Sequence, residues 1–264
     1  MVTAIIVAAG QGIRMGNSVP KQYLMLGDHP ILVHSLMAFS LCRLVDNLYL
    51  VIPESDMDYC RQKIVWPLKL GIDIKLVPGG PQRQLSVYNG LRKIEDRQGI
   101  VVIHDGVRPF VTPDLIRICV QGAKETGACI PAVPVADTLK KVNRSGLINH
   151  TVAREGVWQA QTPQAFAYEL ITQAHEKARV DGFIASDDAL LVERLGAKVK
   201  IVTGNRNNLK ITTPEDLRIA RAMITFDRMN EQIEDQPDNC KNLKLRNSMT
   251  VNGLPVIGEG CDGN

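Results

Sequence analysis

A glycine-rich stretch near the N-terminus, VAAGQGIRMG, carries residue types that bind phosphate groups. It follows an apolar run typical of a buried strand and contains Gly10, Gly12 and Arg14, and Lys21 comes soon after it. Glycines let a backbone approach a ligand closely, successive N–H groups attract anions, and Arg and Lys neutralise phosphate charge. This combination favours a loop that wraps a polyphosphate, although a plain strand-to-helix connection fits the same residues.

The spacing of these glycines does not match two common phosphate-binding loops. A dinucleotide-binding loop needs G-x-G-x-x-G leading directly into a helix, whereas Met15 stands at the third glycine position and Pro20 interrupts the helix. An ATPase loop needs Gly-Lys-Ser/Thr at a fixed offset, and the stretch lacks it. The loop therefore predicts triphosphate binding of another kind.

Polar residues also follow two other apolar runs. Asp105 ends IVVIHD, and a carboxylate beside a polyphosphate is productive only when a divalent cation separates the negative charges. Asp105 therefore predicts a site for Mg²⁺ or another divalent cation, with Arg108 close behind. Gly80 follows IDIKLVP, where a flat base can lie against the backbone, and Ser86 is available for a hydrogen bond. An ordinary turn explains each of these features when it is taken alone.

The elements that must position these residues alternate regularly along the chain. Val- and Ile-rich runs typical of buried parallel strands alternate with helical patterns, which predicts an α/β domain with a doubly wound, mostly parallel sheet. Ligands of such domains bind beyond the carboxyl ends of the strands, where the glycine loop and Asp105 would lie. The strand-like runs are 3–9, 47–53, 72–78, 100–105, 128–135 and 198–204, and the helical patterns are 31–41, 86–96, 111–120 and 212–224.

The segment from about 135 to 158 departs from this alternation. Two extended, half-polar runs flank the turn-like NRSG, which predicts a β-hairpin that projects from the sheet domain. Because a two-stranded ribbon is marginally stable alone, a second subunit is its expected support. Thr138 and Arg154 lie on the two arms of the hairpin, and Lys210 precedes the last helical pattern. Taken singly, such residues are more often solvated than functional.

The composition narrows the classes of partner. The net charge of +3 is mild and the basic residues are scattered, which argues against a nucleic-acid binder or a polybasic membrane anchor and favours a small anionic substrate. The six cysteines show neither a CxxC pair nor metal-ligand spacing, so we expect reduced packing residues in a cytoplasmic protein. The N-terminal apolar run is too short to span a bilayer, and we expect no membrane segment.

Two further expectations concern catalysis and domain organisation. No Ser-His-Asp or Cys-His pattern stands out, which favours charge stabilisation without a covalent nucleophile, and we expect Asp187 and Asp188 to favour a helix start. The periodicity fades after about Phe226. This predicts a domain over 1–225 and a C-terminal tail over 226–264, to which the sequence assigns no role.

Eight ordered blocks carry a more specific signal than any single loop: AAGQGIRMG, PKQYL, GG with QRQLSVYNGL, HDGVRPF, DTLKKV, TVAREGVWQAQTPQAF, SDDA and NLKITTPEDL. Over about residues 2–225 the chain resembles the 2-C-methyl-D-erythritol 4-phosphate cytidylyltransferase family of the non-mevalonate isoprenoid pathway. That family transfers a cytidylyl group from CTP to methylerythritol phosphate and releases pyrophosphate. The resemblance implies a Rossmann-like nucleotidyltransferase fold and a homodimer formed through the hairpin as a dimerisation arm.

The resemblance also implies roles for individual residues. The implied catalytic residues are Arg14, Lys21, Arg154 and Lys210, and Asp105 is implied to lie near Mg²⁺. The residues implied in CTP binding are Ala8, Ala9, Gly10, Gly12, Arg14, Lys21, Gly80, Ser86 and Asp105. Those implied in acceptor binding are Arg108, Thr138, Arg154 and Thr162, of which Thr138 and Arg154 act in the partner's site. Pro81 departs from the acidic residue that many relatives carry at a ribose or base contact.

Two other functions stay open on the sequence alone. Ribitol 5-phosphate cytidylyltransferases share the glycine loop and the PKQ and QTPQ blocks, so it is mainly DTLKKV and TVAREGVW that separate them from this chain. A nucleotide-binding regulatory module that has lost catalysis would share the fold. The joint presence of the phosphate-binding cations and of Asp105 argues against this second alternative.

Overall fold

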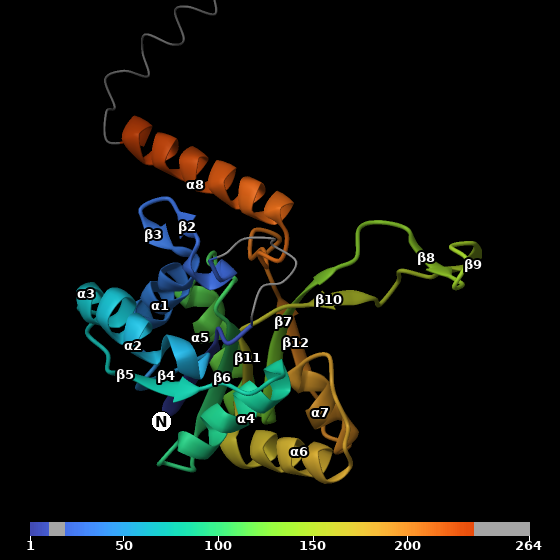
Figure 1. The fold of residues 1–264 in the computed structure, drawn as a ribbon. Helices are drawn as coiled ribbons and strands as arrows, with labels where there is room; N and C mark the ends of the chain where they lie inside the picture. The colour runs from blue at the N-terminus through green and yellow to red at the C-terminus, as the bar shows by residue number, and fades with distance from the viewer. Residues whose placement is uncertain (11–18, 235–264) are drawn as a thin grey trace, which may run out of the picture. The chain divides into compact units, whose positions relative to one another are not determined.

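An eight-stranded sheet forms the centre of the computed structural model, which describes residues 1–10 and 19–234 (Figure 1). The strand order is β10-β7-β11-β6-β1-β4-β5, and β12 pairs with β7. The pairs β6–β1, β1–β4 and β4–β5 are parallel, and so is the pair β12–β7. Strand β11 is antiparallel to β6 and β7, and β10 is antiparallel to β7. The strands are β1 (Val2–Val7), β4 (Asn47–Ile52), β5 (Ile74–Pro78), β6 (Ile100–Asp105), β7 (Ala128–Pro134), β10 (Trp158–Ala160), β11 (Gln164–Ala167) and β12 (Lys200–Thr203).

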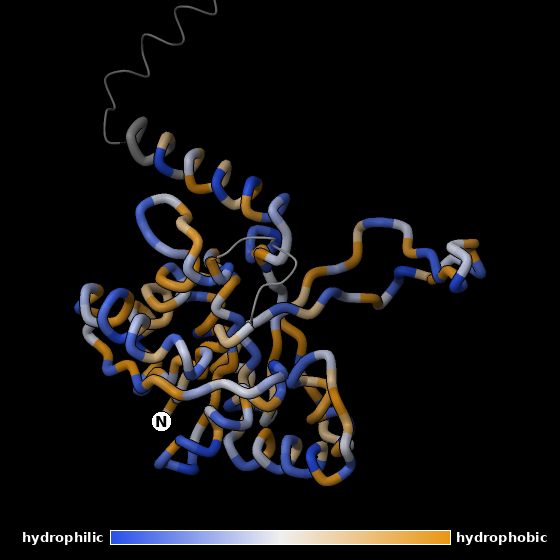
Figure 2. The backbone as a smooth tube through the Cα atoms, in the orientation of Figure 1, coloured by the Kyte–Doolittle hydropathy of each residue, from blue (hydrophilic) through white to orange (hydrophobic). Residues whose placement is uncertain are grey.

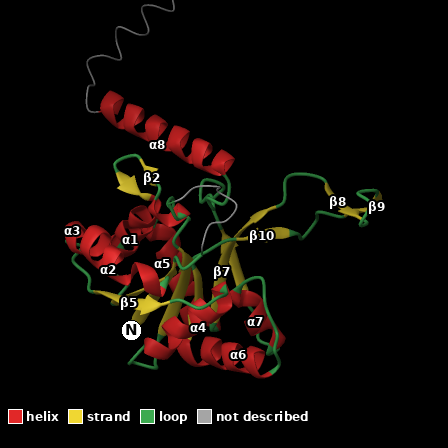
Figure 3. Ribbon diagram, in the orientation of Figure 1, coloured by secondary structure: helices red, strands yellow, loops and turns green. Residues whose placement is uncertain are grey.

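Helices cover both faces of this sheet (Figure 3). Along β1, Ala4 and Ile6 pack with α1 and α5, whereas Ile5 and Val7 pack with α4, α6 and α7. Both faces of the strand are therefore buried, and the predicted doubly wound, mostly parallel α/β fold is confirmed. These helices are α1 (Ile31–Leu41), α4 (Arg83–Lys93), α5 (Pro113–Thr126), α6 (Tyr168–Val180) and α7 (Asp188–Arg194).

The remaining elements are short or peripheral. They are η2 (Lys21–Tyr23), β2 (Met25–Leu26), β3 (His29–Pro30), η3 (Glu54–Asp56), α2 (Met57–Tyr59), η4 (Cys60–Val65), α3 (Trp66–Leu68), β8 (Leu139–Val142), β9 (Ile148–Val152) and α8 (Pro214–Glu234). Among the described helices, none is both long enough and apolar enough to cross a lipid bilayer.

The strand register brings three loops to one edge of the sheet. Val7 at the end of β1 lies opposite Asp105 at the end of β6, and Ile52 at the end of β4 lies opposite Pro78 at the end of β5. The chain runs from β1 through β4 to β5 and then returns to β6 on the other side of β1. Such a switch point is where ligands of open α/β sheets bind.

Polar caps fix the starts of the helices near this edge. Thr112 accepts a hydrogen bond from the N–H of Leu115 at the start of α5, and Asp187 accepts one from the N–H of Leu190 at the start of α7. The predicted helix start at Asp187 is thus confirmed. Side-chain oxygens in these positions satisfy N–H groups that have no partner within the helix.

The chain's contacts divide it into Met1–Arg221 and Ala222–Asn264. Helix α8 runs across this division and continues beyond Phe226 to Glu234, into the segment expected to be a tail. The rest of that segment, 235–264, lies outside the described residues.

The predicted hairpin is present. β8 and β9 pair in antiparallel fashion, and the Asn143 side chain closes the turn by accepting hydrogen bonds from the N–H groups of Ser145 and Leu147, each at 3.0 Å. Beside the turn of the hairpin, Leu147 is 67% and Ile148 61% exposed. Figure 2 shows hydrophobic positions, coloured orange, at this end of the hairpin.

Two features of the sheet were not predicted. Strand β11 lies between β6 and β7 and is antiparallel to both; it pairs with the start of β7, at Ala128 and Cys129. Strand β10 pairs with the other end of β7, from Ala132 to Pro134. Both strands are too short for alternating hydrophobicity to mark them. The three residues between them, 161–163, interrupt the pairing beside the end of β6.

A close approach of two loops at the carboxyl edge gives a test of this packing. A Cβ atom on Gly79, directly after β5, would lie 2.3 Å from the Cβ of Ala9 and 3.3 Å from the carbonyl oxygen of Ile52. We expect Gly79→Ala to lower the free energy of unfolding by about 1–3 kcal/mol, because the ends of β1 and β5 must move apart. Urea denaturation measures the change.

Gly71→Ala is the matched control, since a Cβ there meets nothing within 4 Å. It should change the free energy of unfolding by less than about 0.5 kcal/mol. Equal stability of the two variants would contradict the described approach of Gly79 to Ala9.

Candidate active site

A cavity of about 440 Å³ opens at the carboxyl edge of the sheet. The loop after β1 lines one part of it, the loop after β5 a second, and the end of β6 a third. Gly12 and Arg14 lie outside the described residues. The structure brings together in this cavity all the other residues expected to bind CTP, and Lys210 with them: Ala8, Ala9, Gly10, Lys21, Gly80, Ser86, Asp105 and Lys210.

A second cavity of about 230 Å³ shares part of its wall with the first. Arg108 and Thr162, two of the residues expected to bind the acceptor, line this second cavity. Arg83, Asp105 and Lys210 line both cavities. The described residues expected to bind CTP thus line one cavity, and Arg108 and Thr162 line the adjacent one, with three charged side chains at their common boundary.

Asp105 holds two cations at this boundary. Its Oδ1 accepts a hydrogen bond from Arg83 Nε at 2.8 Å, and its Oδ2 pairs with Lys210 Nζ at 2.6 Å. Burial alone would raise the pKa of the Asp105 carboxyl, but the charges of Arg83 and Lys210 hold it well below its usual range. With Lys21, three described cations thus face one carboxylate in the larger cavity, which suits an anionic ligand.

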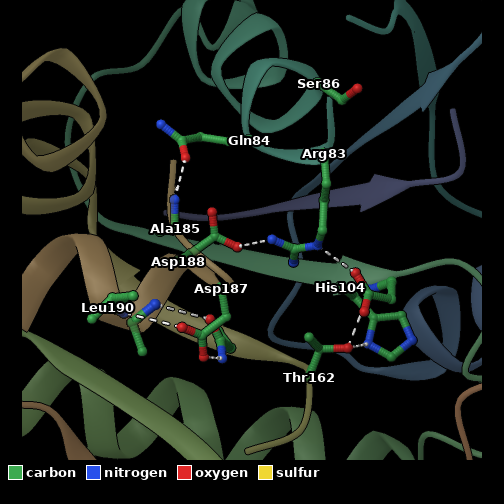
Figure 4. A network of polar contacts seen from close by, with 12 residues as sticks. Arg83, Gln84, Ser86, His104, Thr162, Ala185, Asp187, Asp188 and Leu190 are labelled. Atoms are coloured by element: carbon green, nitrogen blue, oxygen red, sulfur yellow. Dashed lines mark hydrogen bonds and ion pairs between the residues drawn. The ribbon is translucent and has the colours of Figure 1, made fainter. Parts of the chain in front are cut away.

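Sequence reasoning missed Arg83 as a site residue. Its guanidinium also donates from Nη1 to Asp188 Oδ2 at 2.7 Å, and Figure 4 shows it reaching from α4 toward Asp188. Asp188, expected only to favour a helix start, is buried and bonded to both Arg83 and His175. The helical pattern in the sequence begins at Ser86, so no signal placed Arg83 in the first turn of a helix, where the structure shows it.

A hydrogen-bond chain fixes the hydroxyl of Thr162. The N–H of Asp105 donates to Thr162 Oγ1 at 3.1 Å, and Oγ1 lies 3.0 Å from His104 Nδ1. Burial lowers the pKa of His104 to about 3, so the ring is neutral, and its Nε2 faces the carbonyl oxygen of Arg108. Nε2 therefore carries the proton, and Nδ1 accepts the hydroxyl proton of Thr162. Thr162 is left with a lone pair, and no proton, for a ligand.

Ser86 holds the glycine loop in shape. Its Oγ accepts a hydrogen bond from the N–H of Gly80 at 3.0 Å and donates to the carbonyl oxygen of Gln82 at 3.1 Å. The side chain is 1% exposed. Its hydroxyl proton is used within the loop, so Ser86 contributes to the cavity mainly by fixing the backbone. Pro81 also lines the cavity.

The hairpin residues lie outside both cavities. Thr138 and Arg154 are exposed, and Arg154 Nη1 donates to the carbonyl oxygen of Ala136 at 2.6 Å across the base of the hairpin. Neither residue lines the larger or the smaller of these two cavities.

Asp105 fits a metal ion only as one ligand among several. No group of three or more His, Cys, Asp or Glu side chains able to hold a metal is present in 1–10 and 19–234. Asp105 is the single carboxylate among the described residues that line the larger cavity. Mg²⁺ in nucleotide sites takes one or two carboxylates together with phosphate oxygens and water. Each oxygen of Asp105 is already paired with a cationic side chain, so a metal ion here would share one of these oxygens and take its other ligands from the nucleotide and water.

Comparison with known proteins places this geometry in a family. The model of the 2-C-methyl-D-erythritol 4-phosphate cytidylyltransferase family matches residues 2–226. The proteins of that name from Geotalea uraniireducens and Geobacter metallireducens are 46% and 48% identical to this chain, each over 84% of it and over 96% and 97% of their own lengths.

Solved structures agree with this match. The crystal structure of 4-diphosphocytidyl-2C-methyl-D-erythritol synthase from Anaerococcus prevotii has a TM-score of 0.74 at 33% identity, and covers 85% of this chain and 98% of that one. The 2-C-methyl-D-erythritol 4-phosphate cytidylyltransferase from Thermus thermophilus has a TM-score of 0.68 at 34% identity, over 84% and 98% of the two chains. The chain therefore belongs to the 2-C-methyl-D-erythritol 4-phosphate cytidylyltransferase family.

Proposed function

We propose that this protein transfers the cytidylyl group of CTP to 2-C-methyl-D-erythritol 4-phosphate. The products are 4-diphosphocytidyl-2-C-methyl-D-erythritol and pyrophosphate, in isoprenoid precursor synthesis. The observation that carries the proposal is the pair of adjacent cavities whose common wall holds Arg83, Asp105 and Lys210, in a chain of this family. One cavity takes the nucleotide and the other takes the acceptor, so that their phosphates meet at the cations.

The chemistry requires charge stabilisation more than proton transfer. An oxygen of the acceptor phosphate attacks the α-phosphorus of CTP in line, and negative charge builds on the departing pyrophosphate. Lys21, Lys210 and Arg83 neutralise this charge and orient the reacting groups, and Arg14 adds to them. A phosphate dianion is already nucleophilic at neutral pH, so no general base is needed.

A divalent cation, such as Mg²⁺, would enter this site with the nucleotide. Asp105 would supply one oxygen ligand, and the other ligands would be phosphate oxygens and water. When bound, the cation neutralises triphosphate charge. Lys210 and Arg83, which pair with the two oxygens of Asp105, would lie close to such a cation and to the phosphates that came with it.

The second cavity supplies complementary groups for the acceptor. Arg108 provides a cation, and Thr162 offers only a lone pair, because its proton is directed to His104. Thr162 therefore suits a hydroxyl of the polyol, which has a proton to donate, rather than a phosphate dianion. Arg108 suits the phosphate.

We also propose that the hairpin joins two copies of the chain. Its exposed side chains Val142, Leu147 and Ile148 support an apolar contact. In such a dimer Thr138 and Arg154 reach the acceptor in the partner's site. The described cysteines, Cys42, Cys60, Cys119 and Cys129, are free and buried, which supports residence in a reducing compartment such as the cytoplasm.

Pyrophosphate release tests the proposed reaction directly. The purified protein with CTP and Mg²⁺ should release pyrophosphate with methylerythritol phosphate and far less with ribitol 5-phosphate, a rival that the family match and the named relatives do not favour. Faster release with ribitol 5-phosphate would replace the proposed acceptor. Binding of CTP without turnover on either acceptor would instead indicate a regulatory module.

Removal of a cation from the larger cavity tests the mechanism. We expect Lys21→Ala, and likewise Arg14→Ala, to lower kcat by roughly 10² or more, the scale for losing one preorganised group that faces developing charge. Steady-state kinetics measure the loss. Lys63→Ala, which removes an exposed lysine outside both cavities, is the control and should leave kcat unchanged. Near-normal kcat in Lys21→Ala would reassign the loop as a plain connection.

Subunit mixing tests the arm. Arg154→Ala should weaken binding of methylerythritol phosphate and leave CTP affinity nearly intact, because Arg154 meets one substrate only. In a mixed dimer of Arg154→Ala and Lys21→Ala chains, one site combines the intact parts of both chains and the other carries both defects. Since a two-fold dimer has isologous contacts, activity should approach half that of the wild type. A mixed dimer that is confirmed by native mass yet inactive would place Arg154 outside the partner's site.

A further inference from the structure

Two buried residues outside both cavities, Asp188 and His175, contact the cation that the cavities share. Arg83 is the first residue of α4, and the first turn of that helix has no acidic residue. A positive charge is unfavourable there, because the N-terminal end of a helix carries partial positive charge. Arg83 is therefore held against this field by carboxylates from other elements.

These carboxylates bind different nitrogens of the guanidinium. Asp105 accepts from Nε and Asp188 accepts from Nη1, while Nη2 is buried without a hydrogen-bond partner. Because the guanidinium is planar and rigid, fixing two of its nitrogens also fixes the third. Asp188 thus decides how Arg83 is turned at the boundary of the cavities.

His175 in turn holds Asp188. Its Nε2 lies 3.0 Å from Asp188 Oδ1, on the oxygen that Arg83 does not use, and both side chains are 1% exposed. Burial alone would raise the pKa of Asp188, but the charge of Arg83 and the hydrogen bond from His175 lower it below its ordinary value. The carboxylate is therefore ionised and held from two sides. Both oxygens of Asp188 are therefore engaged, whereas Arg83 Nη2 and His175 Nδ1 are buried without a hydrogen-bond partner.

We propose that Asp188 and His175 are positioning residues for cytidylyl transfer. They touch no substrate, and they act by orienting the Arg83 guanidinium toward the phosphates at the cavity boundary. Without Asp188, Arg83 would depend on Asp105 alone, whose other oxygen is already paired with Lys210. The inference rests on the proposed function, because orientation matters only if phosphates react there.

A double-mutant cycle separates positioning from simple structural support. Asp188→Asn should lower kcat by roughly 10- to 100-fold, the scale for misplacing a reactive group by about 1 Å. In an Arg83→Gln background the same substitution should lower kcat by less than about twofold, since no guanidinium remains to be oriented. Equal losses in the two backgrounds would overturn the proposal.

A pair of His175 variants gives an independent arm, which decides the matter if Asp188→Asn does not fold. His175→Phe keeps a ring in the core but removes the donor, whereas the amide of His175→Gln can still donate to Asp188. We expect the Phe variant to lose kcat and the Gln variant to recover most of it, at comparable Tm. Equal kcat in the two variants would contradict the proposed role of His175.

Asp181→Asn is the matched control. Asp181 also pairs with cations of α6 and α7, Lys177 at 2.6 Å and Arg194 at 3.0 Å, but it does not contact Arg83. This variant should change Tm and leave kcat unchanged.

If the wild-type chain itself released no pyrophosphate, the proposed function would fail. In that case the same cycle, measured by calorimetry as affinity for CTP, would test the orientation of Arg83 alone. A loss of CTP affinity from Asp188→Asn in the wild type but not in Arg83→Gln would support that orientation, and equal losses would overturn it.

Discussion

The candidate site depends on the two ion pairs of Asp105, one from each carboxylate oxygen. Arg83 and Lys210 come from segments far apart in the sequence, and two cations side by side repel each other unless an anion lies between them. Asp105 supplies that anion from the end of β6, with one oxygen for each cation. Both cations consequently lie on the wall shared by the two cavities, where two anionic substrates must approach each other.

The fold fixes the position of this carboxylate. The register of β6 with β1 sets the end of the strand, and the break between β10 and β11 brings Thr162 against the backbone N–H of Asp105. The neutral ring of His104 then takes the proton of Thr162. The antiparallel strands inserted in an otherwise parallel sheet thus bring Thr162, which lines the smaller cavity, against Asp105 at the boundary of the two cavities.

Local patterns were sufficient for the parallel strands, the caps and the hairpin, because each depends on residues close together in sequence. The same holds for Lys21, Gly80 and Asp105, which follow apolar runs whose ends must share one edge of the sheet. The bonds from Arg83 to Asp188 and from Thr162 to His104 were not predictable in this way. They join segments that meet only after the sheet has formed, and Thr162 was assigned by resemblance alone.

The proposed role of Asp105 is to organise the cations where the cytidylyl group is transferred, and Asp105→Asn removes the charge that does so. The measurement pairs calorimetric binding of CTP with the kcat of pyrophosphate release at saturating Mg²⁺ and substrates. We expect CTP affinity to be kept or increased, because the cations of the larger cavity remain, while kcat falls by roughly 10² or more. A variant that retained kcat within a few-fold of the wild type would contradict it.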